Sequence, residues 1–448
     1  NLSALRDPAL YVEPARYQRA VSDLSRVLGT TGRDDLTVNP ANYQDHKLSP
    51  VKSGDLLRAA GDPAENIFYD YFAARLDRLV AENPPALVGF SINYLSQAMT
   101  AFAMIGYLKK RHPTLPIAAG GGLITSWLSS PDWRNPFNEL IDHLVAGPGE
   151  IPLLKISGRQ KDHIETEEIR PDFTGLPLAD YLAPGLVLPY AASSGCYWRK
   201  CSFCPEKAET NPYRALPAGL VSGQLAKLTA ATKPSLIHFL DNAISPALMR
   251  ALIANPPGPA WYSFARAEPE LTDPDFCRAL RRSGCVMLKL GLESGDQSVL
   301  DEMDKGIDLG MVAQTLTNLE NAGIATYVYL LFGTPTESLT EARRTLEFTV
   351  KHASAITFLN LAIFNMPRFA PDAARLAKAA FYEGDLSLYT DFEHPRGWNR
   401  REIRRFLDRE FKRHPAIVPI IRRDPPFFTS NHAPFLIPAS NKTMEIPI

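Results

Sequence analysis

Between residues 187 and 364, short apolar runs alternate six times with segments of helical periodicity. The expected strands are residues 187–193, 235–240, 260–266, 286–293, 325–332 and 356–364. Continuous apolar runs of this length are typical of strands that are buried on both faces of a parallel sheet. Six consecutive strand–helix units therefore predict an α/β protein with a parallel, barrel-like sheet. In such barrels the chemistry lies at the carboxyl ends of the strands.

Three cysteines follow the first expected strand directly, in the segment SSGCYWRKCSFCPE. Cys196, Cys201 and Cys204 have the spacing C-x4-C-x2-C, and thiolates this close are better metal ligands than disulfide partners in an intracellular-looking protein. A closed zinc site needs four ligands, and no nearby Cys or His supplies the fourth. A zinc loop with a distant fourth ligand stays the alternative. Three thiolates on a [4Fe–4S] cluster would leave one iron open, as catalysis requires.

Composition narrows the class of protein further. The chain has 448 residues, a net charge of −1 and no apolar run near the ~20 residues of a membrane span, so neither a nucleic-acid partner nor a membrane span is expected. Cys277 and Cys285 are isolated and are interpreted as buried core thiols. Without a visible signal peptide, these features predict a cytoplasmic protein. Because the chain begins at Asn1, we expect preceding residues to be missing from the sequence.

Strand and helix patterns also alternate in the first part of the chain. Helices are expected at residues 10–28, 65–82 and 98–110, and strands at residues 87–92, 117–122 and 143–147. Glycines end two of these strands, which is typical of a doubly wound, Rossmann-like α/β domain with its ligand crevice at the strand ends. Residues 156–187 are rich in proline and are interpreted as a linker.

The cysteine loop resembles that of radical S-adenosylmethionine (SAM) enzymes, in which three cysteines bind a [4Fe–4S] cluster and SAM chelates the open iron. Phe203 takes the place of the aromatic residue before the last cysteine, although the family's usual spacing is one residue shorter. Gly291–Gly306, GLESGDQSVLDEMDKG, and Phe332–Ser338, FGTPTES, are similar to the family's strand-four and strand-five segments. The resemblance implies a partial (β/α)6, TIM-like barrel over residues 188–366.

The same resemblance implies roles for residues at the first three strand ends. The three cysteines would ligate the cluster, and Tyr197 and Trp198 would shield it. Asp241 and Asn242 lie where the family often has a glycine-rich turn for the SAM amino group. Arg266 would reach the SAM carboxylate or a substrate acid, and its alternative is a salt bridge to Glu268 or Glu293.

At the next two strand ends, Glu293 and Ser294 would hold the ribose or amino group of SAM, because carboxylates accept hydrogen bonds from hydroxyl and ammonium groups. Backbone at Leu331, Phe332 and Gly333 would meet the adenine edge. Lys305 is interpreted as a solvated helix end rather than a ligand.

Residues 85–152 are similar to the cobalamin-binding-type domain that precedes the barrel in one subfamily. The shared phrases are Val88–Ser91, Gly120–Gly122 and Asp142–Glu150. Cobalamin would contact Ser91, Asn93, Gly120, Gly121 and Gly122. The signature that supplies a lower-axial histidine is absent, and Asp142-His143 is interpreted as a strand edge. The alternatives are glycines that serve tight packing alone and a domain that holds no cobalamin.

The predicted domains are residues 1–155, the cobalamin-type domain; 156–187, the linker; 188–366, the barrel; and 367–448, a mostly helical or irregular cap over the barrel mouth. Within the cap, helices are expected at residues 372–383 and 400–413. The candidate substrate contacts are Tyr389, His394, Trp398 and His432, and the alternative for each of them is simple packing.

The predicted function is reductive cleavage of SAM to a 5′-deoxyadenosyl radical, followed by cobalamin-dependent C-methylation of a small molecule or peptide at an unactivated carbon. The expected electron donor is a flavodoxin or ferredoxin. One alternative is cobalamin-free rearrangement, cyclisation or carbon–carbon coupling, and another is a non-enzymatic metal-binding or redox-sensing module. RNA thiomethylation is disfavoured, because enzymes with that activity normally carry an extra cysteine set and a basic tail, and this chain lacks both.

Overall fold

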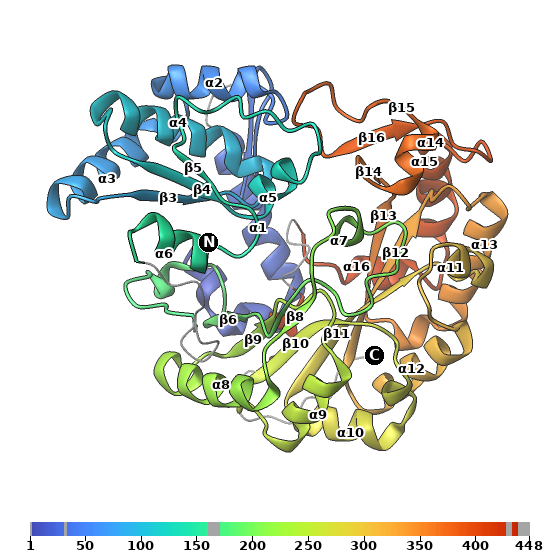
Figure 1. The fold of residues 1–448 in the computed structure, drawn as a ribbon. Helices are drawn as coiled ribbons and strands as arrows, with labels where there is room; N and C mark the ends of the chain where they lie inside the picture. Colours follow the sequence, from blue (N-terminus) through green and yellow to red (C-terminus); the bar gives the residue numbers. More distant parts are fainter. Residues whose placement is uncertain (1, 31–33, 160–170, 427–431, 438–448) are drawn as a thin grey trace. The chain divides into compact units, whose positions relative to one another are not determined.

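The computed structural model describes residues 2–30, 34–159, 171–426 and 432–437, which form two compact units (Figure 1). The barrel unit comprises Asn1–Arg26, Ile169–Phe364 and Glu393–Ile448, and the small-sheet unit comprises Val27–Glu168 and Asn365–Phe392. This division differs from the predicted boundaries, because the first 26 residues pack with the barrel and residues 365–392 pack with the small sheet. Residues 160–170 of the predicted linker and residues 427–431 and 438–448 of the predicted cap lie outside the described residues.

The barrel unit is organised around six parallel strands. They are β6 (Val187–Tyr190), β9 (Leu236–Phe239), β10 (Ala260–Ala265), β11 (Cys285–Glu293), β12 (Ala325–Phe332) and β13 (Phe358–Ile363). Neighbours along the sheet follow the order of the chain, from β6 at one edge to β13 at the other. The predicted barrel-like parallel sheet of six strand–helix units is therefore confirmed.

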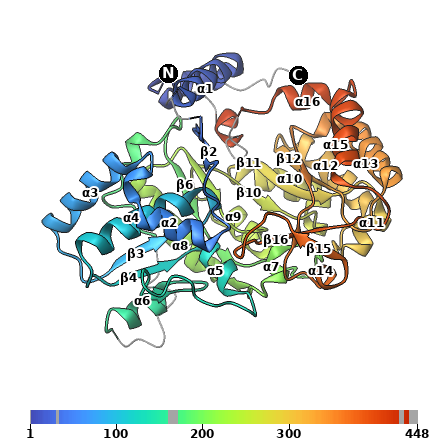
Figure 2. The ribbon, with the colours of Figure 1, turned by 90° about the horizontal axis from the view of Figure 1, so that it is seen from above.

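Helices between the strands cover the outer face of this sheet (Figure 1). They are α8 (Ala218–Thr232), α9 (Pro246–Ala254), α10 (Pro274–Arg282), α11 (Gln297–Glu302), α12 (Leu309–Asn321) and α13 (Leu339–Lys351). Figure 2 shows α10, α12 and α13 alongside β10–β12. Side-chain caps begin several of these helices: Ser245, Asp273, Asp296, Asp308 and Ser338 each accept a hydrogen bond from a backbone N–H in the first turn.

Two hydrophobic clusters line the two faces of the sheet. Leu188, Trp261, Leu290 and Leu330 belong to the large cluster that joins the strands to their helices. The opposite face holds a smaller cluster that includes Tyr262, Met287 and Tyr327 and is joined by Ala433 of the short 3-10 helix η9 (Ala433–Leu436). Alternate residues of each strand therefore face the helices and the barrel interior.

The remaining elements of the barrel unit are short or peripheral. They are η1 (Ala4–Arg6), η2 (Pro8–Val12), α1 (Pro14–Gly29), which extends past the unit boundary, η5 (Leu178–Asp180), β7 (Ser193–Ser194), α7 (Pro205–Ala208), β8 (Arg214–Ala215), η6 (Pro269–Thr272), η7 (Ala353–Ala355), α15 (Arg400–Arg409), η8 (Phe411–Arg413) and α16 (Val418–Arg422). Phe435 beside η9 packs on Tyr11 and Tyr17, which joins the first residues of the unit to its last described ones.

The small-sheet unit contains the parallel strands β3 (Val88–Ser91), β4 (Ile117–Gly120) and β5 (His143–Leu144) in that order. Its helical elements are α2 (Ser53–Gly61), η3 (Pro63–Glu65), α3 (Tyr69–Glu82), α4 (Leu95–Arg111), α5 (Gly122–Leu128) and α6 (Glu150–Ile156). Figure 1 shows α4 between α2 and the sheet. In a doubly wound sheet the strand order reverses at one point, whereas the three described strands follow the order of the chain without a reversal.

Five further strands complete this unit. The hairpin is formed by β1 (Leu36–Asn39) and β2 (Asn42–Asp45), and a second antiparallel sheet is formed by β14 (Met366–Pro367), β16 (Tyr389–Phe392) and β15 (Ala377–Ala380). The predicted helix over residues 372–383 is wrong in its second half: α14 (Pro371–Leu376) ends where β15 begins. The next residues pair with β16 instead, so pairing across the sheet overrides the local preference of an alanine-rich segment.

Candidate functional site

The cysteine loop follows β6 and is held in place at both ends. The Asp241 carboxylate, at the end of β9, accepts a hydrogen bond from Ala192 N at 3.0 Å and another from the Ser193 hydroxyl. Further along, Ser202 N donates to Met303 O at 2.9 Å, and Trp198 Nε1 donates to Asp304 O at 2.8 Å. The loop is therefore held by the end of β9 and by the residues that follow α11.

The three thiols of the loop are free. Cys201 is buried, and Cys196 and Cys204 are half-buried. Burial raises the pKa of Cys201, which is raised further by Cys196 and lowered by Lys305 and Arg266. Burial also raises the pKa of Cys204 to about 11, and Cys201 contributes to that increase. Cys201 is thus within electrostatic range of both other thiols of the loop.

The donor set of this loop fits an iron–sulfur cluster. Among the described residues, no group of three or more His, Cys, Asp or Glu side chains is arranged to hold a metal ion. Three cysteines nevertheless supply the soft thiolates that an iron–sulfur cluster takes, with one iron left for another ligand. Thiols with raised pKa values release their protons when they bind iron.

Aromatic side chains surround the loop. The Trp198 ring lies against Arg266, whose Cζ is 4.2 Å from the ring centroid, and it packs so closely on Gly306 that a Cβ there would lie 1.9 Å from Cζ2 of the indole. The Tyr197 hydroxyl donates to Glu268 Oε1 at 2.8 Å, and the Phe203 ring lies 5.6 Å from Lys305 Nζ. These contacts hold the three rings against residues that lie outside the loop, and their shielding role stays a prediction.

Arg266 and Lys305 are buried cations beside the loop, and each has an acidic partner. Arg266 Nε lies 3.2 Å from Glu268 Oε1, as the salt-bridge alternative predicted, and its Nη2 donates to Lys305 O at 2.7 Å. Lys305 Nζ lies 2.8 Å from Glu293 Oε1. The interpretation of Lys305 as a solvated helix end is therefore wrong, because its side chain folds inward onto Glu293.

Glu293 ends β11 in a strained conformation. Its φ of 68° is in the left-handed region that non-glycine residues rarely adopt, and the pairing with β12 shifts register between Gly291 and Glu293. Such outliers cluster at active sites and ligand clamps. The side chain predicted to bind SAM is thus aimed by a local irregularity of the strand.

Two other residues predicted for SAM have different surroundings. Ser294 is fully buried, and its hydroxyl lies 3.1 Å from Thr345 Oγ1 and accepts from Asp296 N at 3.1 Å. Asp241 is likewise engaged, with the cysteine loop, whereas Asn242 beside it is exposed. The hydroxyl of Ser294 therefore serves the junction of β11 with α13, and Asp241 serves the loop.

The end of β12 forms a second buried polar group. Phe332 packs on Phe406 and Phe411, so its ring contributes to the core. The Glu337 carboxylate accepts hydrogen bonds from Gly333 N and from Trp398 Nε1, the latter at 2.9 Å. Burial raises the pKa of Glu337 to about 8. This network fixes the backbone that was predicted to meet adenine.

The candidate substrate contacts from the predicted cap pack into the protein. Trp398 and His394 are buried against the end of β12, where His394 Nε2 lies 2.8 Å from Thr334 O. His432 is buried against the Tyr327 and Phe358 rings. Tyr389 belongs to β16 of the small-sheet unit. Three of the four thus have packing roles, the plainer of their two predicted interpretations.

In the small-sheet unit, the residues predicted for cobalamin gather at the carboxyl ends of β3 and β4. Asn93 Oδ1 accepts from Gly122 N at 2.9 Å, and Asn93 Nδ2 donates to Ser91 Oγ at 3.3 Å. Gly121 has a φ of 99°, and a Cβ there would lie 2.6 Å from Ile92 O. Tight packing therefore explains Gly121. Ser91 and Asn93 are exposed at this edge, and their contact with cobalamin stays a prediction.

Asp142 and His143 agree with their interpretation as a strand edge. His143 begins β5, and the Asp142 carboxylate accepts from Ile117 N at 2.7 Å and pairs with Lys109. Those bonds lower the pKa of Asp142 against the opposing effect of its burial. The aspartate therefore anchors β5 beside β4.

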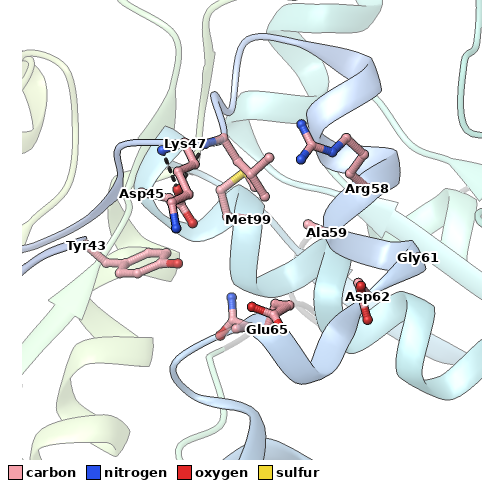
Figure 3. Close-up of a pocket in the computed structure, with 11 residues that line it drawn as sticks. Tyr43, Asp45, Lys47, Arg58, Ala59, Gly61, Asp62, Glu65 and Met99 are labelled. Atoms are coloured by element: carbon pink, nitrogen blue, oxygen red, sulfur yellow. Dashed lines mark hydrogen bonds between the residues drawn. The ribbon is translucent and has the colours of Figure 1, made fainter. Parts of the chain in front are cut away.

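The same unit contains a pocket of about 390 Å³ beside the β1–β2 hairpin (Figure 3). It is lined by residues of the hairpin, α2, η3 and α4, among them Tyr43, Arg58, Glu65 and Met99. Asp45 Oδ1 accepts from the backbone of Lys47, so part of the polar lining is engaged in the turn. None of the predicted site residues lies in this pocket.

Sequence reasoning missed two buried ionisable residues near the site, Lys289 and Glu337. Lys289 has no exposed surface, and its ammonium group has no hydrogen-bond partner among the described residues. A charged residue inside the apolar run VMLKLGLE was the available signal. For Glu337 no comparable signal existed, because its motif also predicts an exposed turn.

Comparison with known families identifies the barrel. Residues 190–349 match the family described as the radical SAM superfamily. These residues therefore form a radical SAM domain, which makes the chain an enzyme. Such a domain works with a [4Fe–4S] cluster and SAM, which agrees with the predicted cofactors. No curated protein matches the sequence.

Solved structures resemble more of the chain than the barrel. The radical SAM methyltransferase TsrM from Kitasatospora setae, with cobalamin and a [4Fe–4S] cluster bound, is 18% identical, with a TM-score of 0.55 over 79% of this chain and 82% of that chain. The cobalamin-dependent SAM radical enzyme OxsB, with aqua-cobalamin bound, is 15% identical, with a TM-score of 0.57 over 75% of this chain and 60% of that chain. At these identities the likeness shows the fold. Within the described part of the chain, no helix combines the length and apolar character that membrane crossing requires.

Proposed function

We propose that this radical SAM enzyme is a cobalamin-dependent C-methylase that acts on an unactivated carbon of a small molecule or peptide. An electron donor such as a flavodoxin or ferredoxin would reduce it in a cytoplasmic setting. The observation that carries the proposal is the loop of three free cysteines at the carboxyl end of the first of six parallel strands.

The likeness to TsrM supports the cobalamin part of the proposal. The 79% of the chain that matches is more than the barrel unit contains, so the match extends into the small-sheet unit. In that unit Ser91 and Asn93 are exposed at the strand ends, where a cofactor could lie. Cobalamin-free rearrangement, cyclisation or coupling is the alternative if this edge holds no corrin.

Within this proposal the cofactors supply an electron to SAM, a radical that removes a hydrogen atom from the substrate, and a methyl group. The chain supplies position and exclusion of water. Cys196, Cys201 and Cys204 would hold the cluster, and Tyr197, Trp198 and Phe203 would shield it. The Glu293 carboxylate would release Lys305 and bind the amino or ribose group of SAM instead, since a carboxylate accepts hydrogen bonds from either kind of donor. A dry interior protects a radical from side reactions.

The test is reconstitution with iron and sulfide under anaerobic conditions, followed by addition of SAM and dithionite. The proposal predicts four irons per chain and release of 5′-deoxyadenosine and methionine. A C196A/C201A/C204A variant should lose both, whereas C277A/C285A, which removes the two buried thiols outside the loop, should retain both. Intact SAM in the presence of a full cluster would contradict the proposed cleavage.

Cobalamin is tested separately. Protein purified after growth with hydroxocobalamin should show corrin absorbance in a ratio near one per chain, and addition of SAM with a deuterated methyl group should label the product. Cluster-dependent SAM cleavage without corrin absorbance would favour the cobalamin-free alternative. Zinc in place of iron would favour the non-enzymatic module.

A further inference from the structure

Lys289 lies in the middle of β11 and faces the barrel interior. Side chains alternate along a strand, and Leu288, Leu290 and Leu292 belong to the cluster that packs on the helices. Met287 belongs to the cluster on the opposite face, so Lys289, two residues along, shares that face. Its exposed fraction is 0%.

Aromatic rings surround the Lys289 ammonium group. Its Nζ lies 4.6 Å from the Phe264 ring centroid and 5.1 Å from that of Tyr262. The His238 ring is stacked on Tyr262 with centroids 4.3 Å apart, and Tyr327 is paired with Lys289 in the sheet. Among the described residues neither Lys289 Nζ nor His238 Nε2 has a hydrogen-bond partner.

The charge of Lys289 has no counterion in the described structure, unlike its buried neighbours. Arg266 is paired with Glu268, and Lys305 is paired with Glu293. The attraction between ring faces and an ammonium group offsets only part of the cost of burying the charge, so an unpaired buried charge remains unfavourable. An anion that reached this position would therefore bind strongly, because the low dielectric of the interior strengthens the attraction.

The position is one layer below the proposed SAM site. Lys289 and Gly291 are successive inward positions of β11, and Glu293 follows after the irregularity of the strand, so the Cα atoms of Lys289 and Glu293 are at most about 13 Å apart. Gly291 has no side chain to separate them. Glu293 Oε1 and Lys305 Nζ lie 2.6 and 2.8 Å from where a Gly291 Cβ would be. Lys289 is thus the next side chain of β11 beneath the Glu293–Lys305 pair.

We propose that Lys289 forms the floor of the substrate site and binds the carboxylate of an aromatic or apolar monocarboxylic acid. The proposal rests on the proposed function and adds a substrate class to it. A single ammonium group matches a single negative charge, whereas a phosphate dianion is better matched by several donors. The rings of Tyr262, Phe264 and Tyr327 match an apolar body next to that carboxylate.

The experiment measures binding of acids and their primary amides to the cluster-loaded enzyme by isothermal titration calorimetry. The probes are benzoate, phenylacetate and 3-phenylpropionate with the corresponding amides, and phenyl phosphate. At least one acid should bind ten-fold or more tightly than its amide and more tightly than phenyl phosphate. Equal affinities of acids and amides would overturn the proposal without any variant, as would tighter binding of phenyl phosphate.

The variant K289M should bring the affinity of the preferred acid down to that of its amide. The matched control K227M removes an exposed lysine of α8 and should leave the preference unchanged. An unchanged preference in folded K289M would overturn the proposal. Because binding needs no turnover, an acid preference without SAM cleavage supports the subsite and contradicts only the proposed function. Cleavage without an acid preference overturns the subsite alone.

Discussion

Burial gives Lys289 and Glu337 pKa values of about 8, so both titrate close to neutral pH, where ordinary lysines and glutamates do not. For Lys289 the shift is downward and for Glu337 it is upward, because desolvation disfavours the charged form in each case. Each side chain therefore lowers the free energy of unfolding at pH values where it would be charged in the unfolded chain, and substitutions should measure that loss.

For Lys289 we predict that K289M stabilises the protein. The shift from 10.5 to about 8 corresponds to about 3 kcal/mol of unfolding free energy, and Met conserves the volume of the side chain. Between pH 8 and pH 10.5 the unfolded chain binds more protons than the folded one, so wild-type stability rises and the advantage of K289M shrinks. His238 and the tyrosines around Lys289 are common to both proteins. Urea unfolding from pH 7 to pH 10.5 checks this, and a destabilised K289M at pH 7 would contradict it.

Glu337 should behave in the opposite direction. Its folded pKa is raised, so its contribution to stability is present below pH 4.5 and is lost as the pH rises to about 8. E337Q keeps an acceptor for Gly333 N and Trp398 Nε1 but cannot ionise. Between pH 4.5 and pH 8 the free energy of unfolding of E337Q should rise relative to that of wild type by on the order of 3–5 kcal/mol, measured by urea unfolding. The exposed E347Q serves as control, and parallel pH profiles for E337Q and wild type would refute the assignment.

At the scale of elements, the cysteine loop depends on the end of β9. D241A leaves Ala192 N and the Ser193 hydroxyl without their acceptor, which should destabilise the loop by about 1–3 kcal/mol. We expect the reconstituted variant to retain fewer irons per chain and to lose them faster to a chelator. N242A, which changes the exposed neighbouring residue, should match wild type. Equal iron retention in D241A would show that the loop is held by its other contacts.

Strands and helices of the barrel could be predicted from the sequence because their periodicity is local. Each of the six expected strands lies within about three residues of a strand of the sheet. The failures are places where distant residues decide the outcome. Glu293 turns Lys305 inward, and pairing with β16 converts residues 377–380 from the expected helix into a strand. Neither partner is adjacent in sequence, so periodicity could not indicate them.

At the scale of the whole molecule, the division into two units also depends on distant contacts. The segment 365–392 follows the barrel in sequence but packs with the small sheet, where Leu386 N donates to Val51 O at 2.9 Å. The first 26 residues pack with the barrel through Tyr11 and Tyr17. The predicted boundaries at residues 155 and 366 followed a proline-rich segment and the family resemblance, neither of which carries information about such returns of the chain.

The proposed chemistry requires that Cys196, Cys201 and Cys204 leave one iron of a [4Fe–4S] cluster open for SAM. Mössbauer spectroscopy of protein reconstituted with ⁵⁷Fe tests it most directly, because it separates the irons by their ligands. With SAM added, one iron in four should change its isomer shift. C196A/C201A/C204A should hold no cluster, and C277A/C285A should behave as wild type. Four equivalent irons that ignore SAM, or a single zinc ion held by these thiolates, would contradict it.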